Sequence, residues 1–368
     1  MDMSIGWAIL GIIGGLVALV IGGELLVRGA SLLATALRIS PLIIGLTVVA
    51  FGTSAPELGV SLQAALTGNA DVAIGNVVGS NIFNILLILG LAAVVTPLVV
   101  SSQLIRADVP IMVGASLALW GFSLDQRLER WEGAVLFVAL LGYIVFCIRQ
   151  SRHESAAVVQ EFAQELPKLS TWTSRRSIQI SLMIVGLVLL GFGSHWLVGG
   201  AVKIATVLGV SKLIIGLTIV AAGTSLPEVV TSVVASLRGE RDIAVGNVIG
   251  SNLFNILCVL GLSSIISPQG IVIAKDALEF DIPVMVAVAV VCFPIFLTGN
   301  LIARWEGGLL LFYYVAYTLL IVLSETYPEH GTWFASILAY VVVPLTLLTL
   351  IGSLVWARRN RQSAESLP

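Results

Sequence analysis

Charged residues are scarce in this chain. Only 11% of its 368 residues are Asp, Glu, Lys or Arg, whereas a soluble domain would carry about 25%. Hydrophobic residues make up 58%, and the mean hydropathy is +1.04. This composition excludes an ordinary soluble protein and indicates a chain that crosses the membrane several times. A nucleic-acid partner is not expected, because no basic cluster lies on a soluble module.

Histidine and cysteine are also rare, with three of each in the chain. Cys147, Cys258 and Cys292 lie in apolar runs without any CxxC spacing, so we expect buried apolar packing and no disulfide framework. No cofactor is predicted. The first residues, MDMSIGWAIL, lack a positive n-region and a small-residue cleavage site. They predict a first membrane helix rather than a removable signal peptide.

Eleven apolar segments have the length of roughly 20 residues that a membrane span needs. They cover 6–27, 42–66, 71–95, 105–124, 132–149, 177–200, 213–237, 242–266, 280–298, 306–323 and 333–356. We predict an all-α polytopic membrane protein, divided by a single long polar stretch. Its predicted parts are a first five-helix repeat (1–149), a cytoplasmic linker (150–176), a second five-helix repeat (177–323), and an extra helix with a cytoplasmic tail (324–368). We expect the eleventh helix to be an appended span; a re-entrant or peripheral helix is the alternative.

The two sets of five helices are copies of each other. Residues 41–91 and 212–262 align without gaps at an offset of 171, with 32 of 51 positions identical. The motif GTSAPE is answered by GTSLPE, and GNVVGSNIFN by GNVIGSNLFN. Because five is odd, corresponding helices cross the membrane in opposite directions. Inverted repeats of this kind are typical of secondary transporters, which bind their substrate near the midplane where the repeats meet.

The orientation follows from the Lys and Arg residues, which favour the cytoplasmic side. With the N-terminus outside, 14 of them fall in cytoplasmic segments and five outside. The cytoplasmic set is Arg28, Arg38, Arg106, Arg149, Arg152, Lys168, Arg175, Arg176, Arg238, Arg241, Arg304, Arg358, Arg359 and Arg361; the outer set is Arg127, Arg130, Lys203, Lys212 and Lys275. We therefore expect a multi-pass protein of the inner membrane, with the linker and C-terminus in the cytoplasm.

The first motif places a carboxylate inside an apolar segment. Thr53 lies four residues before Glu57 and Ser54 lies three before it, so both share a helix face with the glutamate. Pro56 removes a backbone hydrogen bond and frees a carbonyl near Gly52. An acidic residue at this depth is costly and indicates a functional site. The copy supplies Thr224, Ser225, Pro227 and Glu228.

The second motif adds a polar stripe to an apolar helix. Asn76, Ser80 and Asn84 recur at a spacing of four, and Gly75 and Gly79 form a GxxxG face that allows close helix approach. The copy supplies Asn247, Ser251 and Asn255. We expect Asn84 and Asn255 to contribute ligands. Two interpretations are open for the remaining asparagines of the motif: direct ligation of the cation, or hydrogen bonds at helix ends and between helices. These residues are Asn76, Asn81, Asn247 and Asn252.

Every candidate ligand is a hard oxygen: carboxylate, hydroxyl, amide or carbonyl. This chemistry suits calcium, magnesium, manganese or sodium, and argues against zinc and copper. Glu57 and Glu228 bring two negative charges to one centre. One divalent cation neutralises them, and so do two monovalent cations. Competition for the same carboxylates is a physical basis for antiport.

Other polar residues of the spans have local interpretations. Glu24 has Arg28 one turn further on, which predicts a local ion pair. Asp108 and Asp281 correspond to each other and lie near helix starts, where capping and the helix dipole favour acids. Trp131 and Trp305, each followed by Glu-Gly, are expected to be interfacial anchors.

At the paired motifs, the chain resembles the sodium/calcium exchangers of the cation/calcium exchanger superfamily, over about residues 6–323. The resemblance implies a ten-helix core with four central cation sites. It implies that calcium is held mainly by Glu57 and Glu228, helped by the backbone carbonyls of Thr53 and Thr224. It implies sodium sites built from hydroxyls and carbonyls at Ala50, Ser54, Ser80, Ala221, Ser225 and Ser251. The first and sixth helices of such proteins are thought to slide across the core.

Many members of that family carry an aspartate in one repeat where this chain has Asn84 or Asn255. Here both positions are asparagine, so a possible third carboxylate is missing. The departure bears on ion stoichiometry and makes the potassium-dependent members less similar. It leaves the two glutamates that match the charge of a divalent ion.

We therefore predict a secondary antiporter, not an enzyme, that moves Ca²⁺ out against Na⁺ by alternating access, and we take a monomer as the expected unit. The nearest alternative is exchange of calcium, or another divalent cation, for protons, because a buried carboxylate can release a cation by taking up a proton. An intramembrane hydrolase using Ser54 or Ser225 lacks a base, since His153, His195 and His330 are not duplicated with the serines. A passive channel is a third alternative.

Overall fold

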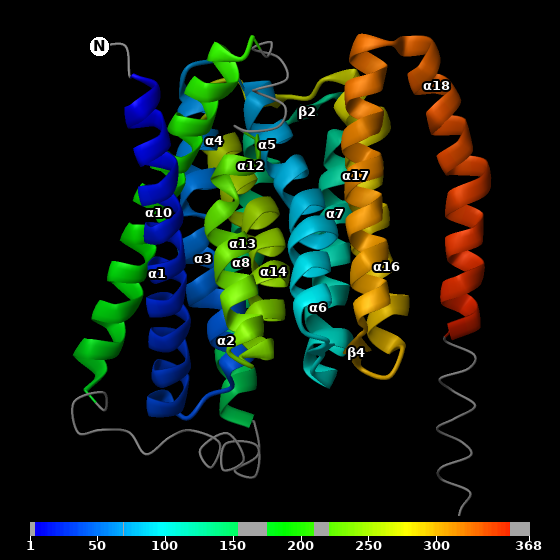
Figure 1. Cartoon of the computed structure of the whole chain (residues 1–368). Helices are drawn as coiled ribbons and strands as arrows, with labels where there is room; N and C mark the ends of the chain where they lie inside the picture. Colours follow the sequence, from blue (N-terminus) through cyan, green and yellow to red (C-terminus); the bar gives the residue numbers. More distant parts are fainter. Residues whose placement is uncertain (1–3, 69, 154–174, 210–220, 354–368) are drawn as a thin grey trace, which may run out of the picture.

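The computed structural model describes residues 4–68, 70–153, 175–209 and 221–353. Helices dominate it and stand side by side as a bundle (Figure 1). Over the described residues, nine helices are long and apolar enough to cross a membrane, and a bent pair makes up to ten. The predicted all-α polytopic fold is confirmed. Of the predicted span 213–237, the structure describes 221–237, because 213–220 lie outside the described residues.

The first repeat begins with the long helix α1 (Ile5–Leu37). A broken span follows, made of α2 (Pro41–Ile44), the π-helix η1 (Gly45–Val49), α3 (Ala50–Thr53) and α4 (Ala55–Leu66). The third span joins α5 (Ala70–Phe83), the π-helix η2 (Asn84–Leu89) and α6 (Gly90–Val95). The π-helix η3 (Leu104–Asp108), α7 (Val109–Phe122) and the short 3₁₀ helix η4 (Ser123–Asp125) form the fourth, and α8 (Arg130–His153) is the fifth.

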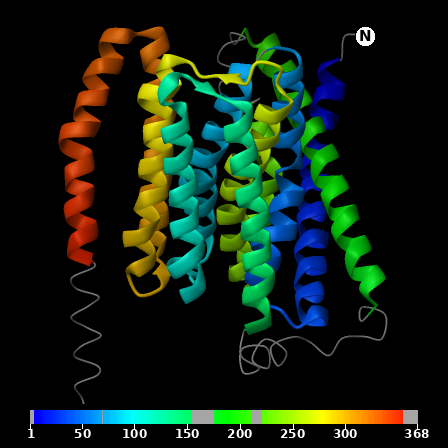
Figure 2. The same ribbon diagram turned by 180° about the vertical axis from the view of Figure 1, so that it is seen from behind.

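The second repeat has the same order. It contains α10 (Arg176–Val207), α12 (Ala221–Thr224), α13 (Leu226–Leu237), α14 (Arg241–Phe254), the π-helix η6 (Asn255–Leu260), α15 (Gly261–Ile266), the π-helix η7 (Ala277–Asp281), α16 (Ile282–Leu297) and α17 (Arg304–Thr326). The last span starts with α18 (Pro328–Ile337) and the π-helix η8 (Leu338–Val342), and runs to Ser353. It stands at the edge of the bundle beyond α17 (Figure 2), and is long enough to be an appended span.

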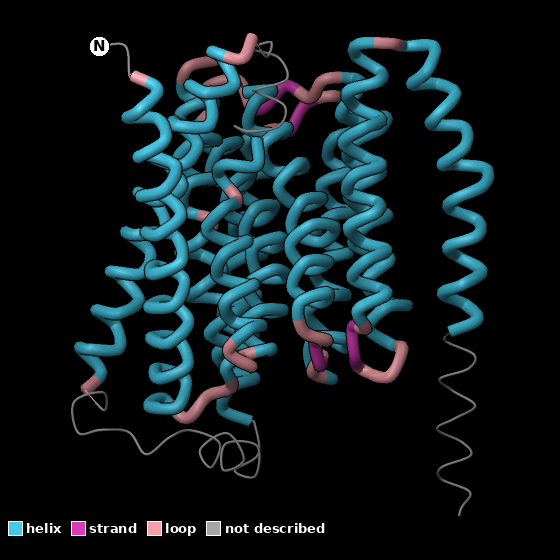
Figure 3. Tube along the Cα trace, viewed as in Figure 1, coloured by secondary structure: helices cyan, strands magenta, loops and turns pink. Residues whose placement is uncertain are grey.

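Two short antiparallel ladders link the repeats. β1 (Leu98–Val99) pairs with β4 (Leu301–Ile302), and β2 (Arg127–Leu128) pairs with β3 (Ile271–Val272). The ladders lie at opposite ends of the bundle (Figure 3). β1 and β3 hold equivalent places in the two repeats, as do β2 and β4. The repeats therefore exchange places between the two ends, which is the geometry expected of an inverted duplication.

Glycines bring α1 and α10 into close antiparallel contact. A Cβ added at Gly15 would lie 2.6 Å from the carbonyl oxygen of Gly193, and one at Gly22 would lie 2.8 Å from that of Gly186. Such contacts leave no room for any side chain, so the two helices pack backbone against backbone. Figure 1 shows the pair side by side at one edge of the bundle.

Both helices are longer than the predicted spans 6–27 and 177–200. Charged residues ended the predicted spans, but a charge does not end a helix, because its long side chain can reach the surface. α1 instead ends where Arg38 takes a left-handed conformation, at φ 57°. The second predicted span is also broken in the middle, with a bend of 46° between its two halves.

One local interpretation is wrong, and a second is confirmed in the position of its residues but not in their capping role. Glu24 does not pair with Arg28: its carboxylate lies 2.7 Å from the Arg238 guanidinium, because it faces the end of α13. Asp108 and Asp281 do not cap their helices with their side chains. Each carboxylate instead accepts a hydrogen bond from a tyrosine of the following span, Tyr143 at 3.1 Å and Tyr317 at 2.9 Å.

Candidate cation-binding site

Each repeat breaks a helix immediately before its glutamate. Ser54 separates α3 from α4, and Ser225 separates α12 from α13, with ψ near 7° at both serines. Glu57 and Glu228 consequently lie in the first turns of α4 and α13. The amino-terminal end of a helix carries a partial positive charge that stabilises a nearby anion. The breaks thus place each carboxylate where the backbone favours it.

The serines and glutamates are paired across the repeats. Ser54 Oγ donates to Glu228 Oε1 at 3.0 Å, and Ser225 Oγ donates to Glu57 Oε1 at 2.8 Å. Ser225 Oγ also lies 3.3 Å from Ser80 Oγ. Since each serine is three residues before the glutamate of its own repeat, this crossed pairing brings the two carboxylates into one centre.

Among the described residues, no basic side chain pairs with the carboxylates of this centre. Glu57 and Glu228 are each 1% exposed. The two ion pairs found among the described residues, Glu24–Arg238 and Lys275–Glu279, include neither glutamate. A buried charge without a counter-charge is strongly destabilising, so the pair calls for bound cations or protons. Within the described ranges, no third His, Cys, Asp or Glu side chain joins the two glutamates, so any further ligands of a cation here would be neutral oxygens.

Several buried oxygen atoms of the paired motifs lack hydrogen-bond partners. They comprise the second carboxylate oxygens and a set of hydroxyl and amide oxygens, namely Glu57 Oε2, Glu228 Oε2, Thr224 Oγ1, Ser251 Oγ, Asn84 Oδ1 and Asn255 Oδ1. Buried polar atoms are normally satisfied, so each exception asks for an explanation. A cation coordinated by hard oxygens would supply the missing partner.

The asparagines after the glutamates form a second crossed network. Asn84 Nδ2 donates to Asn252 Oδ1 at 3.0 Å, and Asn255 Nδ2 donates to Asn81 Oδ1 at 3.1 Å. Each amide nitrogen is thereby occupied, and the amide oxygens of Asn84 and Asn255 are left over. In this arrangement Asn81 and Asn252 bond between helices, which is the second of the two readings open for them.

Asn84 and Asn255 also begin the π-helices η2 and η6. A π-helical turn is rare and frequently marks a functional site, because its wider loop displaces the residues within it. No sequence pattern indicates these turns, since the apolar pattern of a span continues through them. They become visible only in the structure.

In each repeat, one asparagine holds the turn that carries the glutamate. Asn76 Nδ2 donates to the Glu57 carbonyl at 3.2 Å and to Ser61 Oγ at 3.0 Å. In the other repeat, Asn247 Nδ2 donates to the Glu228 carbonyl at 3.4 Å and to Ser232 Oγ at 2.9 Å. Sequence reasoning missed both serines, although they are identical between the two copies.

The remaining predicted positions lie nearby on the same elements. Ala50 is fully buried, and its carbonyl accepts the Ser54 amide at 3.0 Å and the Thr53 hydroxyl at 3.3 Å. Thr53 Oγ1 also donates to Asn247 Oδ1 at 3.0 Å. Ala221 begins α12, the counterpart of α3. Ser80 and Ser251 are buried on α5 and α14.

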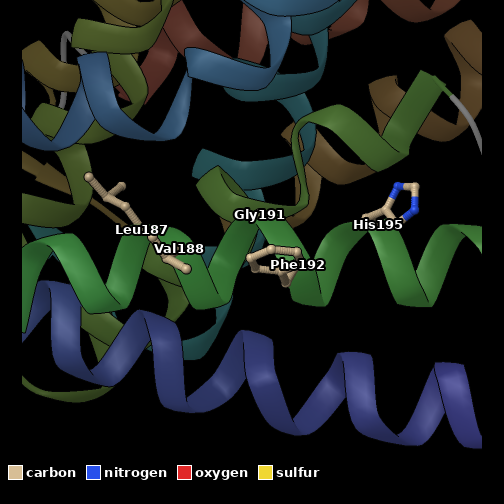
Figure 4. Close-up of a pocket in the computed structure, with 5 residues that line it drawn as sticks. All are labelled: Leu187, Val188, Gly191, Phe192 and His195. Carbon is tan, nitrogen blue, oxygen red and sulfur yellow. The ribbon is translucent and has the colours of Figure 1, made fainter.

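A separate cavity lies along α10. Its volume is about 430 Å³, and Leu187, Val188, Gly191, Phe192 and His195 line it (Figure 4). Four of these five residues are apolar, and none is a predicted ligand. This cavity therefore lacks the oxygen atoms that a hard cation needs, and the paired motifs remain the candidate site.

Comparison with known proteins agrees with this geometry. The sequence profile of the family described as "Sodium/calcium exchanger protein" matches residues 7–149 and 178–323. The chain is 42% identical over 315 residues to the CaxA protein of Alkalimonas amylolytica, covering 84% of this chain and 97% of that protein. It is 33% identical to "Sodium/calcium exchanger MaX1" of Methanosarcina acetivorans, covering 83% and 96%.

A solved structure has the same fold. The sodium-calcium exchanger NCX_Mj, soaked with 10 mM Na⁺ and 10 mM Sr²⁺, superposes with a TM-score of 0.73 at 29% sequence identity. The match covers 85% of this chain and 97% of NCX_Mj. The shared part therefore amounts to nearly the whole of that exchanger.

Proposed function

This chain belongs to the sodium/calcium exchanger family, and we propose that it moves Ca²⁺ against Na⁺ across the membrane by alternating access at the Glu57–Glu228 centre. The coarser statement, a cation/Ca²⁺ antiporter in a multi-pass membrane protein, follows from the family itself. The choice of sodium as the counter-ion is the proposal.

One observation carries the proposal. Two carboxylates, buried to 1% exposure, share a centre without any basic partner among the described side chains. Their Oε2 atoms lack hydrogen-bond partners, as do buried hydroxyl and amide oxygens of the same motifs. A divalent cation would neutralise both charges and satisfy these oxygens together, and calcium accepts such irregular sets of oxygen ligands.

Sodium fits the neutral oxygens of the same region. In the proposed scheme Ca²⁺ takes Glu57 and Glu228 with the carbonyls of Thr53 and Thr224. Sodium ions take the hydroxyls and carbonyls of Ala50, Ser54, Ser80, Ala221, Ser225 and Ser251, and Asn84 and Asn255 contribute amide oxygens. Both cations need the same carboxylates for charge balance, so binding of one displaces the other, and this competition couples the two fluxes.

Flux into sealed vesicles tests the proposal. Calcium uptake should require an outward sodium gradient, and Glu57→Gln or Glu228→Gln should abolish it, because each change removes one charge of the centre. Glu306→Gln is the matched control. Glu306 is equally buried, at 1% exposed, but its carboxylate caps α17 through the Ala303 amide. Full exchange in both centre variants would refute the site.

Proton coupling is the competing function, because the same free carboxylate oxygens can each take up a proton. A pH gradient imposed without sodium separates the two. Calcium uptake driven by that gradient alone would replace sodium with protons as the counter-ion. Uptake driven only by sodium would support the proposal.

We also propose that the protein lies in the inner membrane. Its N-terminus faces outwards, and its linker and C-terminus face the cytoplasm. The distribution of Lys and Arg supports this orientation. A monomer is the proposed unit, because one chain supplies both glutamates. A reporter domain fused after residue 368 tests the orientation. Light scattering of the purified protein tests whether it is a monomer.

A further inference from the structure

Two of the five methionines of the chain occupy equivalent places in the two repeats. Met112 lies four residues after Asp108, and Met285 lies four after Asp281, the counterpart of Asp108. Both methionines are buried, at 0% and 1% exposure, in α7 and α16. A buried thioether usually serves as apolar filling. Here each sulfur also accepts a hydrogen bond, although sulfur is a weak acceptor.

The donors to the two sulfurs are asparagines of the paired motifs. Asn81 Nδ2 donates to Met285 Sδ at 3.7 Å and to the Asn252 carbonyl at 3.3 Å. In the other repeat, Asn252 Nδ2 donates to Met112 Sδ at 3.6 Å and to the Asn81 carbonyl at 3.5 Å. An asparagine amide nitrogen carries two protons, so each nitrogen has one acceptor for each of its protons.

These acceptors fix which way each amide points. A carbonyl oxygen and a thioether sulfur accept hydrogen bonds but cannot donate them, so the Asn81 amide must turn its nitrogen towards them. Its oxygen, on the other side, accepts from Asn255 Nδ2 at 3.1 Å. If Asn81 were turned around, its oxygen would face two acceptors and its nitrogen would face the nitrogen of Asn255. Buried groups left unpaired in this way are costly.

The orientation of Asn81 in turn determines that of Asn255, one of the two asparagines predicted as ligands. Because Asn255 Nδ2 is held by Asn81, the atom left over is Asn255 Oδ1, which is buried without a hydrogen-bond partner. The other repeat does the same: Asn252 Oδ1 accepts from Asn84 Nδ2 at 3.0 Å, which leaves Asn84 Oδ1 without a partner. A ligand amide that turned around would present a donor to the cation.

Burial protects this arrangement. The four asparagines are each 1% exposed, so solvent water has little access to replace a lost partner. The acceptors of Asn81 and Asn252 are a carbonyl and a sulfur that lie on other helices of the bundle, and neither can reverse its polarity. The choice of orientation made at these acceptors is therefore passed on to the amide oxygens of Asn84 and Asn255.

We propose that the two methionines and the two asparagines bonded to them are positioning residues, which aim the amide oxygens of the predicted ligands at the cation. Each path crosses from one repeat to the other and back, and we call the two paths relays. The relays are Met285–Asn81–Asn255 and Met112–Asn252–Asn84. The inference rests on the cation site of the proposed function, but not on which counter-ion is exchanged.

Double-mutant cycles test the relays, because residues that act through one another give losses that do not add. The measurement is calcium binding to the purified full chain, by isothermal titration calorimetry in sodium-free buffer. Asn81→Leu should lower calcium affinity about fivefold, as expected for the loss of one hydrogen bond. Asn81→Leu should cause no further loss in an Asn255→Leu background. It should cause its full loss in an Asn84→Leu background, although Asn84 is only three residues away on the same span.

The methionine variants repeat the test with little change in volume. Met285→Leu removes the sulfur acceptor, and a swap of Met for Leu is well tolerated in a core. It should lower calcium affinity about twofold, because sulfur is a weak acceptor, and only when Asn255 is present. Met183→Leu is the matched control and should not change the affinity. Met183 is also buried, at 4% exposure, but it packs against Gly29 of α1.

Equal losses from Asn81→Leu in the Asn84→Leu and Asn255→Leu backgrounds would overturn the relays, because a general packing defect would act in both. An unchanged affinity in Asn81→Leu itself would do the same. Calcium flux driven by protons instead of sodium would change the proposed function and leave these binding cycles intact. Absence of calcium binding by the parent chain would refute the proposed site, and the relays with it.

Discussion

Ser225 Oγ of the second repeat donates a hydrogen bond to Glu57 Oε1 of the first, at 2.8 Å. The inverse pair, Ser54 and Glu228, has the same geometry at 3.0 Å. Neither repeat therefore holds its own carboxylate by its own serine. The centre exists only where both halves meet, which explains why the duplication preserves the entire motif in each half.

Removing one of these hydroxyls should weaken sodium more than calcium. In Ser54→Ala or Ser225→Ala, the half-saturating sodium concentration should rise about fivefold, as expected for the loss of roughly 1 kcal/mol. Calcium, which depends on the charges of the glutamates, should change less. Sodium-dependent calcium flux over a range of both ions measures the two effects.

Ser116→Ala provides the matched control. Ser116 is buried in α7, where its hydroxyl bonds to the Met112 carbonyl at 2.9 Å. This change should alter neither ion. A larger loss for calcium than for sodium at Ser54 and Ser225 would contradict the division of ligands.

A third carboxylate should change the response to pH. Asn255 Oδ1 is buried without a partner, beside the crossed amide network. In Asn255→Asp, the new carboxyl must lose its proton before it can bind a cation. Calcium affinity of the variant should therefore fall more steeply than that of the parent as the pH is lowered. Isothermal calorimetry between pH 6 and 8 measures this, with Asn255→Gln as the uncharged comparison, and parallel pH profiles for Asp and Gln would contradict it.

The duplication made the fold and the ligand types predictable from the sequence. Two copies of one pattern gave the inverted repeats, since an odd number of spans reverses the second copy. Glu57 and Glu228 stood out because acids are costly in apolar segments. The family and the fold are confirmed, whereas the ligand roles of the individual residues stay predictions.

The rest depends on contacts between distant segments. Glu24 appeared to face Arg28, because helical spacing is visible in a sequence and the end of α13 is not. The π-helices at Asn84 and Asn255 change backbone hydrogen bonds without changing the apolar pattern. The serines Ser61 and Ser232 appeared ordinary until the bonds from Asn76 and Asn247 were seen.

The contact between α1 and α10 should tolerate no added methyl group. A Cβ at Gly22 would meet the Gly186 carbonyl oxygen at 2.8 Å and the Leu190 amide at 2.9 Å. Because both are backbone atoms, the helices must separate, and Gly22→Ala should destabilise the protein by about 1–3 kcal/mol. Thermal unfolding in detergent should show a lower midpoint.

Gly191→Ala is the control for this change, because no described atom lies within 4 Å of the Cβ that it adds to α10. It should keep or slightly raise the midpoint, since alanine is the better helix former. An unchanged midpoint in Gly22→Ala would mean that the two helices are free to separate.

The ion pair between Glu24 and Arg238 should hold α1 against the end of α13. Its atoms approach to 2.7 Å, but the side chains are 35% and 61% exposed, so its contribution should be modest. Exposed pairs are worth about 0.2–1 kcal/mol and are weakened by salt. Arg238→Glu places two acids together and should increase deuterium exchange in 241–250, more at low salt than at high salt.

The double exchange Glu24→Arg with Arg238→Glu restores the attraction and should return deuterium exchange in 241–250 towards the parent value. Glu279→Gln breaks the other surface pair, with Lys275 at 3.5 Å, and should have no effect. If the double exchange behaved like Arg238→Glu alone, attraction between these two charges could not be what holds α1 against the end of α13.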